Sequence, residues 1–117
     1  MNILADEHCV ACRRDAPRVT EAEIAMLKPY VPEWNLIEKD GIPRLERLYR
    51  FRDFQAALAF TQQVGDLGES EGHHPELLTS WGKVIVSWYT HKIKGLHRND
   101  FIMATKTDQL YTPQSSA

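Results

Sequence analysis

The sequence predicts an α+β fold, in which a four-stranded antiparallel sheet carries helices on one face in the order α-β-β-α-β-β-α. Three observations predict it. A helix-capping pattern begins at Thr20, an Asp-Gly turn signal at residues 40–41 lies between two apolar runs, and helical spacing of apolar residues follows from Phe54. At 117 residues, with 43% hydrophobic and 26% charged residues, we expect a single domain over residues 1–117.

The first helix is expected to begin after Thr20, because Thr20 and Glu23 form a capping box in which each side chain bonds the other residue's backbone N–H. Pro29 and Pro32 end this helix soon afterwards. The residues before it, 1–16, are expected to form an irregular N-terminal arm.

A first hairpin is expected around Asp40 and Gly41, since glycine adopts positive φ at little cost. In its second strand apolar and charged residues alternate, which is typical of a half-buried strand. One face carries Leu45, Tyr49 and Phe51 with Arg47 as an exception, and the other carries Arg44, Glu46, Arg50 and Arg52.

The second helix is expected to begin at Asp53, whose side chain can cap it. Its apolar stripe is predicted to contain Phe54, Ala57, Leu58, Thr61, Val64 and Leu67. Gly68 or Gly72 can end it. A third helix is expected from about Arg98 to Leu110, with Phe101, Ala104 and Thr105 inward, followed by a disordered tail over residues 111–117.

The second hairpin is expected to contain strands at about Glu76–Trp81 and Val84–His91, joined by a two-residue turn at Gly82-Lys83. That turn pairs Trp81 with Val84, and the same register places His74 opposite His91, with Cβ atoms roughly 5 Å apart. A register slip of one residue would end the direct pairing but leave His73, His74 and His91 at one corner.

Three imidazoles at one corner are suited to proton transfer, because imidazole supplies acid and base forms near neutral pH. A lone histidine in a strand is usually structural, whereas three convergent ones favour a site. Glu69, near the end of the second helix, is placed to orient one of the rings. The tryptophans of this hairpin, Trp81 and Trp88, indicate that the outer sheet face is not wholly exposed, so self-association is plausible.

Residues 69–100 resemble the pterin-4a-carbinolamine dehydratase family. The matching elements are Glu69, His73-His74-Pro75, Thr90-His91, Gly95-Leu96 and Asp100, and the segment YRFRDFQAALAFTQQV also looks like that family. The resemblance covers roughly residues 20–110. Two positions depart from it: Trp81 stands where a smaller aromatic or polar residue is common, and His97 stands where Ser or Thr normally caps the last helix, so a looser helix start is expected.

The resemblance implies loss of water from a 4a-hydroxytetrahydropterin to give the quinonoid dihydropterin, without a cofactor or a metal. It casts His73 and His91 as the acid/base pair and His74 as the residue that positions and polarises the substrate. The substrate-binding residues that it implies are Glu69, Pro75, Tyr89, Thr90, Lys92 and Asp100. It also implies support of an aromatic amino acid hydroxylase by pterin recycling, and a homodimer or homotetramer.

Alternative functions come from other residues. Cys9 and Cys12 have zinc-type spacing that His8, His73 or His74 could complete, although one CxxC is a weak signal and its redox use weaker still. Family members also serve as dimerisation cofactors, so a non-catalytic dimerisation or binding module of the same fold is the principal alternative. Nucleic-acid binding through Arg44, Arg47, Arg50 and Arg52 is less favoured than a solvated strand face, because Glu46 interrupts them.

Composition and sequence pattern argue against further classes of protein. The formal net charge of −2 gives no general attraction to nucleic acid or anionic lipid. No run approaches the roughly 18 apolar residues of a membrane span, and the N-terminus lacks the pattern of a secretory signal. We therefore expect a cytoplasmic protein whose two cysteines are reduced thiols.

Overall fold

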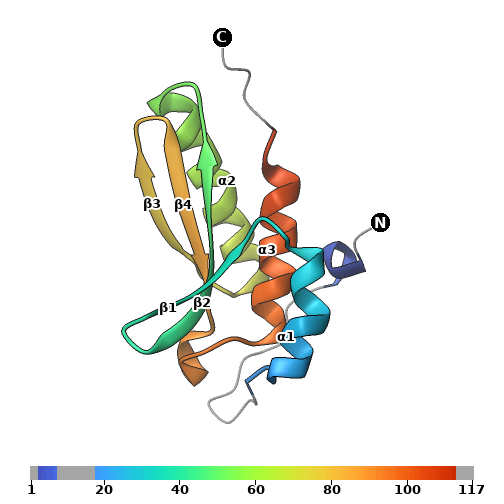
Figure 1. The fold of residues 1–117 in the computed structure, drawn as a ribbon. Helices are drawn as coiled ribbons and strands as arrows, with labels where there is room; N and C mark the ends of the chain where they lie inside the picture. The colour runs from blue at the N-terminus through green and yellow to red at the C-terminus, as the bar shows by residue number, and fades with distance from the viewer. Residues whose placement is uncertain (1–2, 8–17, 113–117) are drawn as a thin grey trace.

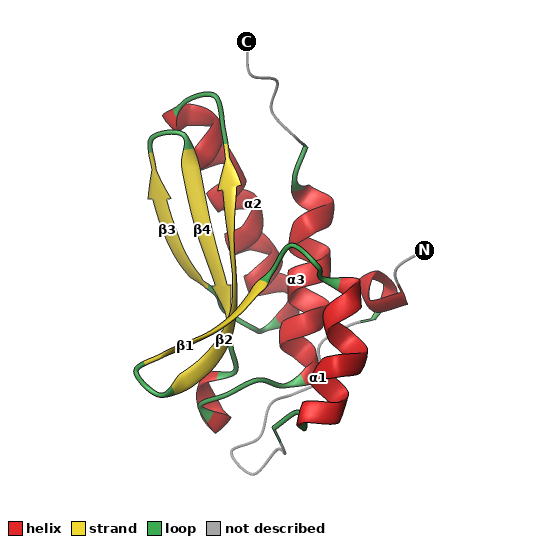
Figure 2. Ribbon diagram, in the orientation of Figure 1, coloured by secondary structure: helices red, strands yellow, loops and turns green. Residues whose placement is uncertain are grey.

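The computed structural model describes residues 3–7 and 18–112, and it confirms the predicted α+β class and element order. Four antiparallel strands form one sheet in the order β1-β2-β4-β3. The helices α1, α2 and α3 lie on one side of this sheet (Figures 1 and 2). The elements are α1 (Glu21–Leu27), β1 (Asn35–Lys39), β2 (Ile42–Arg50), α2 (Phe54–Glu71), β3 (Glu76–Ser80), β4 (Lys83–Trp88) and α3 (Arg98–Leu110), with short 3₁₀ helices η1 (Ile3–Asp6), η2 (Lys28–Tyr30) and η3 (His91–Ile93).

Two of the three observations that predicted the fold, the capping box and the Asp-Gly turn, are confirmed. The Thr20 hydroxyl accepts from the Glu23 backbone N–H at 3.1 Å, and the Glu23 carboxylate accepts from the Thr20 N–H at 2.9 Å. Asp40 and Gly41 form the β1–β2 turn, with φ values of 55° and 78°, between the paired residues Lys39 and Ile42.

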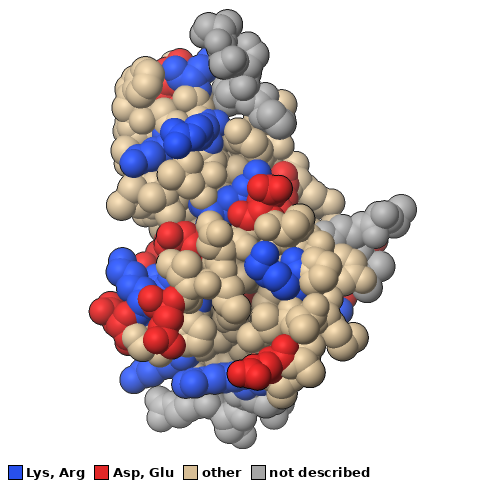
Figure 3. Space-filling view, in the orientation of Figure 1, with Lys and Arg blue, Asp and Glu red and all other residues tan. Residues whose placement is uncertain are grey.

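The arginines of β2 do not form a uniformly solvated face. Arg47, on the face toward the helices, pairs with Asp108 of α3 at 2.8 Å and lies over the Tyr49 ring. Arg44, on the opposite face, is only 3% exposed, so the expectation of a solvated side chain is wrong there. Among the described residues on the face drawn in Figure 3, basic and acidic side chains lie next to one another.

The inward face of α2 is rotated from the one predicted. Phe54 and Leu58 are 45% and 51% exposed, whereas Phe60 is buried. The buried residues of the helix are Ala57, Phe60, Val64 and Gly68. Both stripes have helical spacing, so periodicity alone does not choose between them, and packing against the sheet and α3 decides.

The turn of the second hairpin lies one residue earlier than predicted. Ser80 pairs with Lys83, so Trp81 and Gly82 form the turn, and Gly82 takes the left-handed φ of 75°. The predicted pairing of His74 with His91 is therefore wrong, and β4 ends at Trp88. Trp81 is 72% exposed at the turn, whereas Trp88 belongs to the core and donates from Nε1 to the Thr107 hydroxyl at 3.0 Å.

The core lies between the sheet and the helices, where Leu45, Tyr49, Val84, Val86 and Trp88 meet the inward faces of α2 and α3. The predicted inward residues of α3, namely Phe101, Ala104 and Thr105, are buried.

Both ends of the described chain extend the core beyond the predicted elements. Leu4, in the part predicted to be an irregular arm, is buried in η1, and Tyr111, assigned to the tail, packs against Tyr49 and donates to the Arg50 carbonyl. No helix within residues 3–7 and 18–112 has the length and apolar character needed to cross a bilayer.

Candidate active site

Two glycines at the end of α2 place His73 and His74. Gly72 ends the helix in the left-handed conformation, with φ 64°, and its N–H donates to the Glu69 carbonyl at 3.3 Å. At Gly68 a Cβ atom would lie 3.1 Å from both the His73 carbonyl oxygen and Pro75 Cδ. A side chain at position 68 would therefore push away the segment that carries the histidines.

His73 is held inside the protein. Its side chain is 5% exposed and its Nε2 lies 2.6 Å from Asp100 Oδ1. The ring also stacks nearly parallel on Trp88, with centroids 5.7 Å apart and an angle of 10°. Since a carboxylate oxygen accepts, His73 donates from Nε2, and in the neutral ring Nδ1 is then the nitrogen without a proton.

Asp100 collects three donors at the start of α3. It is fully buried, and its second oxygen accepts from the Thr90 hydroxyl at 2.8 Å and from the His97 backbone N–H at 2.9 Å. His97 in turn caps the helix, because its Nδ1 accepts from the Asn99 N–H at 3.0 Å. The looser helix start expected from His97 is not observed, since both parts of a capping box are present.

His74 lies on the surface beside Glu69. Their side chains are 59% and 78% exposed, and Nε2 lies 2.8 Å from Oε1. Glu69, which was predicted to orient one of the rings, therefore contacts His74 rather than the other two. A contact this exposed adds little to stability.

His91 reaches the same corner from η3 rather than from a paired strand. Its Nε2 lies 3.3 Å from the His74 carbonyl oxygen, so that nitrogen donates. Its ring packs against the Tyr89 ring at 4.3 Å. The fold therefore brings His73, His74 and His91 to one region, which we call the histidine corner, despite the incorrect register.

Tyr89 connects the histidine corner to two residues that the sequence did not predict for this site, Arg44 and Glu76. Its hydroxyl donates to Glu76 Oε2 at 2.8 Å, and the Arg44 guanidinium lies 4.4 Å from its ring centroid. Arg44 also bonds Glu76 Oε1 at 3.1 Å. Desolvation, and then the bond to Glu76, raise the pKa of Tyr89. The Tyr89 bond, and then the charge of Arg44, hold the pKa of Glu76 below its usual value.

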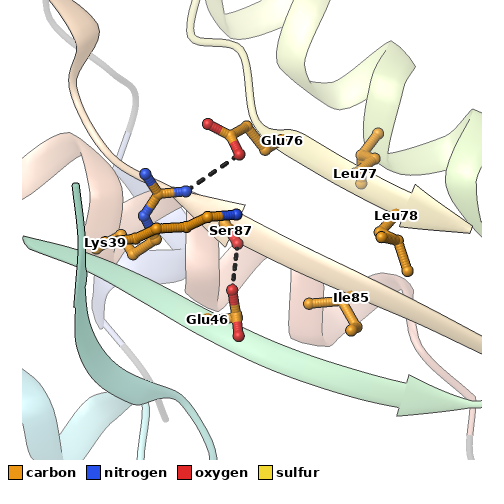
Figure 4. A pocket seen from close by; sticks show the side chains of 8 residues that line it. Lys39, Glu46, Glu76, Leu77, Leu78, Ile85 and Ser87 are labelled. Carbon is orange, nitrogen blue, oxygen red and sulfur yellow. Dashed lines mark hydrogen bonds and ion pairs between the residues drawn. The ribbon is translucent and has the colours of Figure 1, made fainter. Parts of the chain in front are cut away.

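A cleft of about 350 Å³ opens beside this group, on the sheet face turned away from the helices (Figure 4). Arg44 and Glu76 belong to its lining, which also includes Lys39, Glu46, Leu78, Ile85 and Ser87. Its polar groups are partly paired already, since Ser87 donates to Glu46 at 2.9 Å. The cleft combines charged side chains at one end with Leu78 and Ile85 at the other.

The remaining predicted residues make fewer contacts with the histidine corner or lie outside the described residues. Lys92 is exposed on η3, and Pro75 packs toward Gly68 before β3 begins. Cys9, Cys12 and His8 lie outside the described residues. Within the described ranges, no group of three or more His, Cys, Asp or Glu side chains is placed to hold a metal ion.

Comparisons with known proteins bear on the family to which the chain belongs. A family model described as pterin 4 alpha carbinolamine dehydratase matches residues 17–110. A Gloeobacter violaceus protein named "Putative pterin-4-alpha-carbinolamine dehydratase 1" is 61% identical over 107 residues, which cover 92% of each chain. The crystal structure of a transcriptional coactivator/pterin dehydratase from Brucella melitensis matches with a TM-score of 0.71 and 30% identity, over 80% of this chain and 98% of that one.

Proposed function

This chain belongs to the pterin 4 alpha carbinolamine dehydratase family, and we propose that its histidine corner removes water from a 4a-hydroxytetrahydropterin to give the quinonoid dihydropterin. The C4a–O bond breaks and the hydroxyl leaves as water after it gains a proton. A ring nitrogen loses a proton as the C=N bond forms. One proton is gained and one is lost, so an acid and a base suffice.

His73 and His91 are the proposed acid/base pair. The observation that carries this assignment is the contact of His91 Nε2 with the His74 carbonyl oxygen at 3.3 Å. It brings the histidine after β4 next to the histidine pair before β3. In neutral His91 the donating Nε2 leaves Nδ1 as the basic nitrogen, and Nδ1 has no hydrogen-bond partner in the described part of the chain. Asp100 supports His73 by fixing its tautomer.

His74 is proposed to position and polarise the pterin, because its ring is exposed at the corner and its Nε2 lies 2.8 Å from Glu69 Oε1. Tyr89, Lys92, Glu69 and Pro75 are the proposed further substrate contacts. Thr90 and Asp100 are buried, so they act on the substrate through His73 rather than by contact. This refines the role that the resemblance implied for those two residues.

The biological setting of the reaction is also part of the proposal. We infer that the enzyme recycles the pterin cofactor of an aromatic amino acid hydroxylase in the cytoplasm, as a homodimer or homotetramer. Sedimentation equilibrium tests the oligomer, and a monomer at micromolar concentration would contradict it. The non-catalytic module is not favoured, because the name of the Brucella melitensis relative includes the dehydratase.

The test is the rate of dehydration of a 4a-hydroxytetrahydropterin, followed by ultraviolet absorbance. We expect His73→Ala and His91→Ala each to lower the enzymatic rate by about 10²- to 10⁴-fold, the usual contribution of a general acid or base. Gln55→Ala, an exposed change on α2, is the control and should keep the wild-type rate. Wild-type rates in both histidine variants would refute the assignment.

A further inference from the structure

We propose that Arg44 and Glu76 are positioning residues that clamp Tyr89 and, through its ring, hold the imidazole of His91 in its working orientation. The proposal rests on the proposed function, since it assigns a purpose to the placement of His91. The sequence did not predict either residue as part of this site, and they come from β2 and β3, whereas Tyr89 follows β4.

The burial of Arg44 is the first observation. Arg44 is only 3% exposed, although it lies on the sheet face turned away from the helices. Removing a guanidinium from water is costly unless its partners compensate. Its Nε has no hydrogen-bond partner among residues 3–7 and 18–112, so the compensation is incomplete. A buried cation with an unpaired nitrogen contributes little to folding stability. We therefore infer that the contacts of Arg44 serve the site.

Those contacts form a closed triangle. Arg44 bonds Glu76 at 3.1 Å, Glu76 accepts from the Tyr89 hydroxyl at 2.8 Å, and the Arg44 guanidinium lies 4.4 Å from the Tyr89 ring centroid. The phenol is therefore fixed at its hydroxyl by one residue and at its ring face by the other. The strand register explains the meeting, since Leu45 pairs with Trp88 and the next step along each strand brings Arg44 beside Tyr89.

His91 depends on this triangle because little else fixes its ring. The residue is exposed in a three-residue 3₁₀ helix, and the one hydrogen bond of its side chain in the described part of the chain is long, at 3.3 Å. The Tyr89 ring, 4.3 Å away and inclined by 40°, is its ring contact. An exposed side chain exchanges rotamers rapidly unless it is packed, so a mobile Tyr89 would release His91.

The experiment compares four variants in the full chain. Arg44→Met removes the guanidinium but keeps an unbranched apolar stem, and Arg44→Lys keeps the charge without the planar group. Glu76→Gln changes the exposed member of the triangle, so it tests the clamp even if Arg44→Met fails to fold. Arg50→Met is the matched control, because Arg50 lies on the same strand and the same sheet face but is exposed.

Two measurements are made on each variant: kcat and KM for dehydration, and the NMR shifts of the His91 ring protons, which the Tyr89 ring current displaces. We expect Arg44→Met and Glu76→Gln to lower kcat by about 10- to 100-fold, as misplacement of a catalytic group does. KM should change by less than about threefold, because the loss falls on the chemical step. The His91 ring shifts should move toward random-coil values, Arg44→Lys should be intermediate, and Arg50→Met should match the wild type.

Unchanged His91 ring shifts in folded Arg44→Met or Glu76→Gln protein would overturn the proposal, and so would a wild-type kcat. The ring shifts are measured in the protein without substrate. If the wild type did not dehydrate the pterin, the proposed function would fail while the shifts still decided whether the clamp exists.

Discussion

At Asp100, three hydrogen-bond donors meet one carboxylate that has no contact with solvent. The carboxylate thereby connects the start of α3 to the ring of His73. The same side chain serves the helix cap and the proposed catalytic residue, so its loss should affect both stability and rate. These two effects can be separated with a second carboxylate of the same helix.

We predict that Asp100→Asn lowers the dehydration rate by about 10²- to 10⁴-fold, because an amide can turn its NH₂ toward His73 and reverse the tautomer that the carboxylate selects. Asp108→Asn is the matched control, since Asp108 also accepts from three side chains, Trp34, Arg47 and Tyr49, away from the histidines. Both variants should unfold at lower urea concentration, but Asp108→Asn should keep its kcat. Equal rates in the two variants would count against a role of Asp100 beyond folding.

Residue patterns predicted which residues lie in the candidate site better than they predicted its geometry. His73, His74, His91, Glu69 and Asp100 were all selected from the sequence, and the fold brings them together. The pairing of Asp100 with His73, across 27 residues of sequence, could not be deduced because it depends on how α3 packs against β4. The meeting of Arg44 with Glu76 and Tyr89 depends on the register of β4 with both β2 and β3, and analysis of each hairpin alone does not give the β2–β4 register.

At the scale of elements, local turn and cap chemistry was predictable, whereas choices between two similar local patterns were not. The capping box at Thr20 and the Asp40-Gly41 turn each rest on a few adjacent residues. In the second hairpin Gly82 fits either the first or the second position of a two-residue turn, and the structure uses the second. That single difference removed the predicted pairing of His74 with His91.

The inward face of α2 gives a direct test of packing. We predict that Phe60→Ala lowers the free energy of unfolding by about 3–5 kcal/mol, because it leaves a cavity among Tyr49, Phe51 and Tyr111. Leu58→Ala, on the exposed side, should change it by less than about 0.5 kcal/mol. Urea denaturation measures both, and a larger loss in Leu58→Ala would mean that the helix faces the core as the sequence pattern suggested.

The contact of Glu7, the residue after η1, with α3 should depend on pH. Arg98 donates from two nitrogens to both oxygens of Glu7, at 2.9 and 2.6 Å, and these hydrogen bonds lower the pKa of Glu7. A carboxyl whose folded-state pKa is lowered adds stability above its unfolded-state pKa, and that stability is lost as the pH falls through the folded-state pKa.

We therefore predict that Glu7→Gln destabilises the protein at pH 7 and has no effect near pH 2. Both side chains are partly exposed, so the effect at pH 7 should not exceed about 1 kcal/mol. Urea midpoints of wild type and variant at the two pH values measure it. A difference that persists unchanged at the lower pH would show that the carboxylate charge is not its source.

At the scale of the whole molecule, one α+β architecture explains why residues distant in sequence share a site. The sheet order β1-β2-β4-β3 sets β4 between β2 and β3, so the residues after β4 can meet partners from both neighbours. Helix α3 closes the other side of the same strand and supplies Asp100. The histidine corner is therefore formed where α2, β3, η3 and α3 come together, beside the cleft on the outer sheet face.

The central claim is that this corner, rather than the neighbouring cleft alone, holds the reacting part of the pterin. The most direct measurement is a crystal structure with a bound pterin analogue that carries a hydroxyl or equivalent group at the 4a position. We predict that this group lies within about 3.2 Å of a ring nitrogen of His73 or His91, the reach of proton transfer. An analogue bound with its 4a position far from all three histidines would contradict the account.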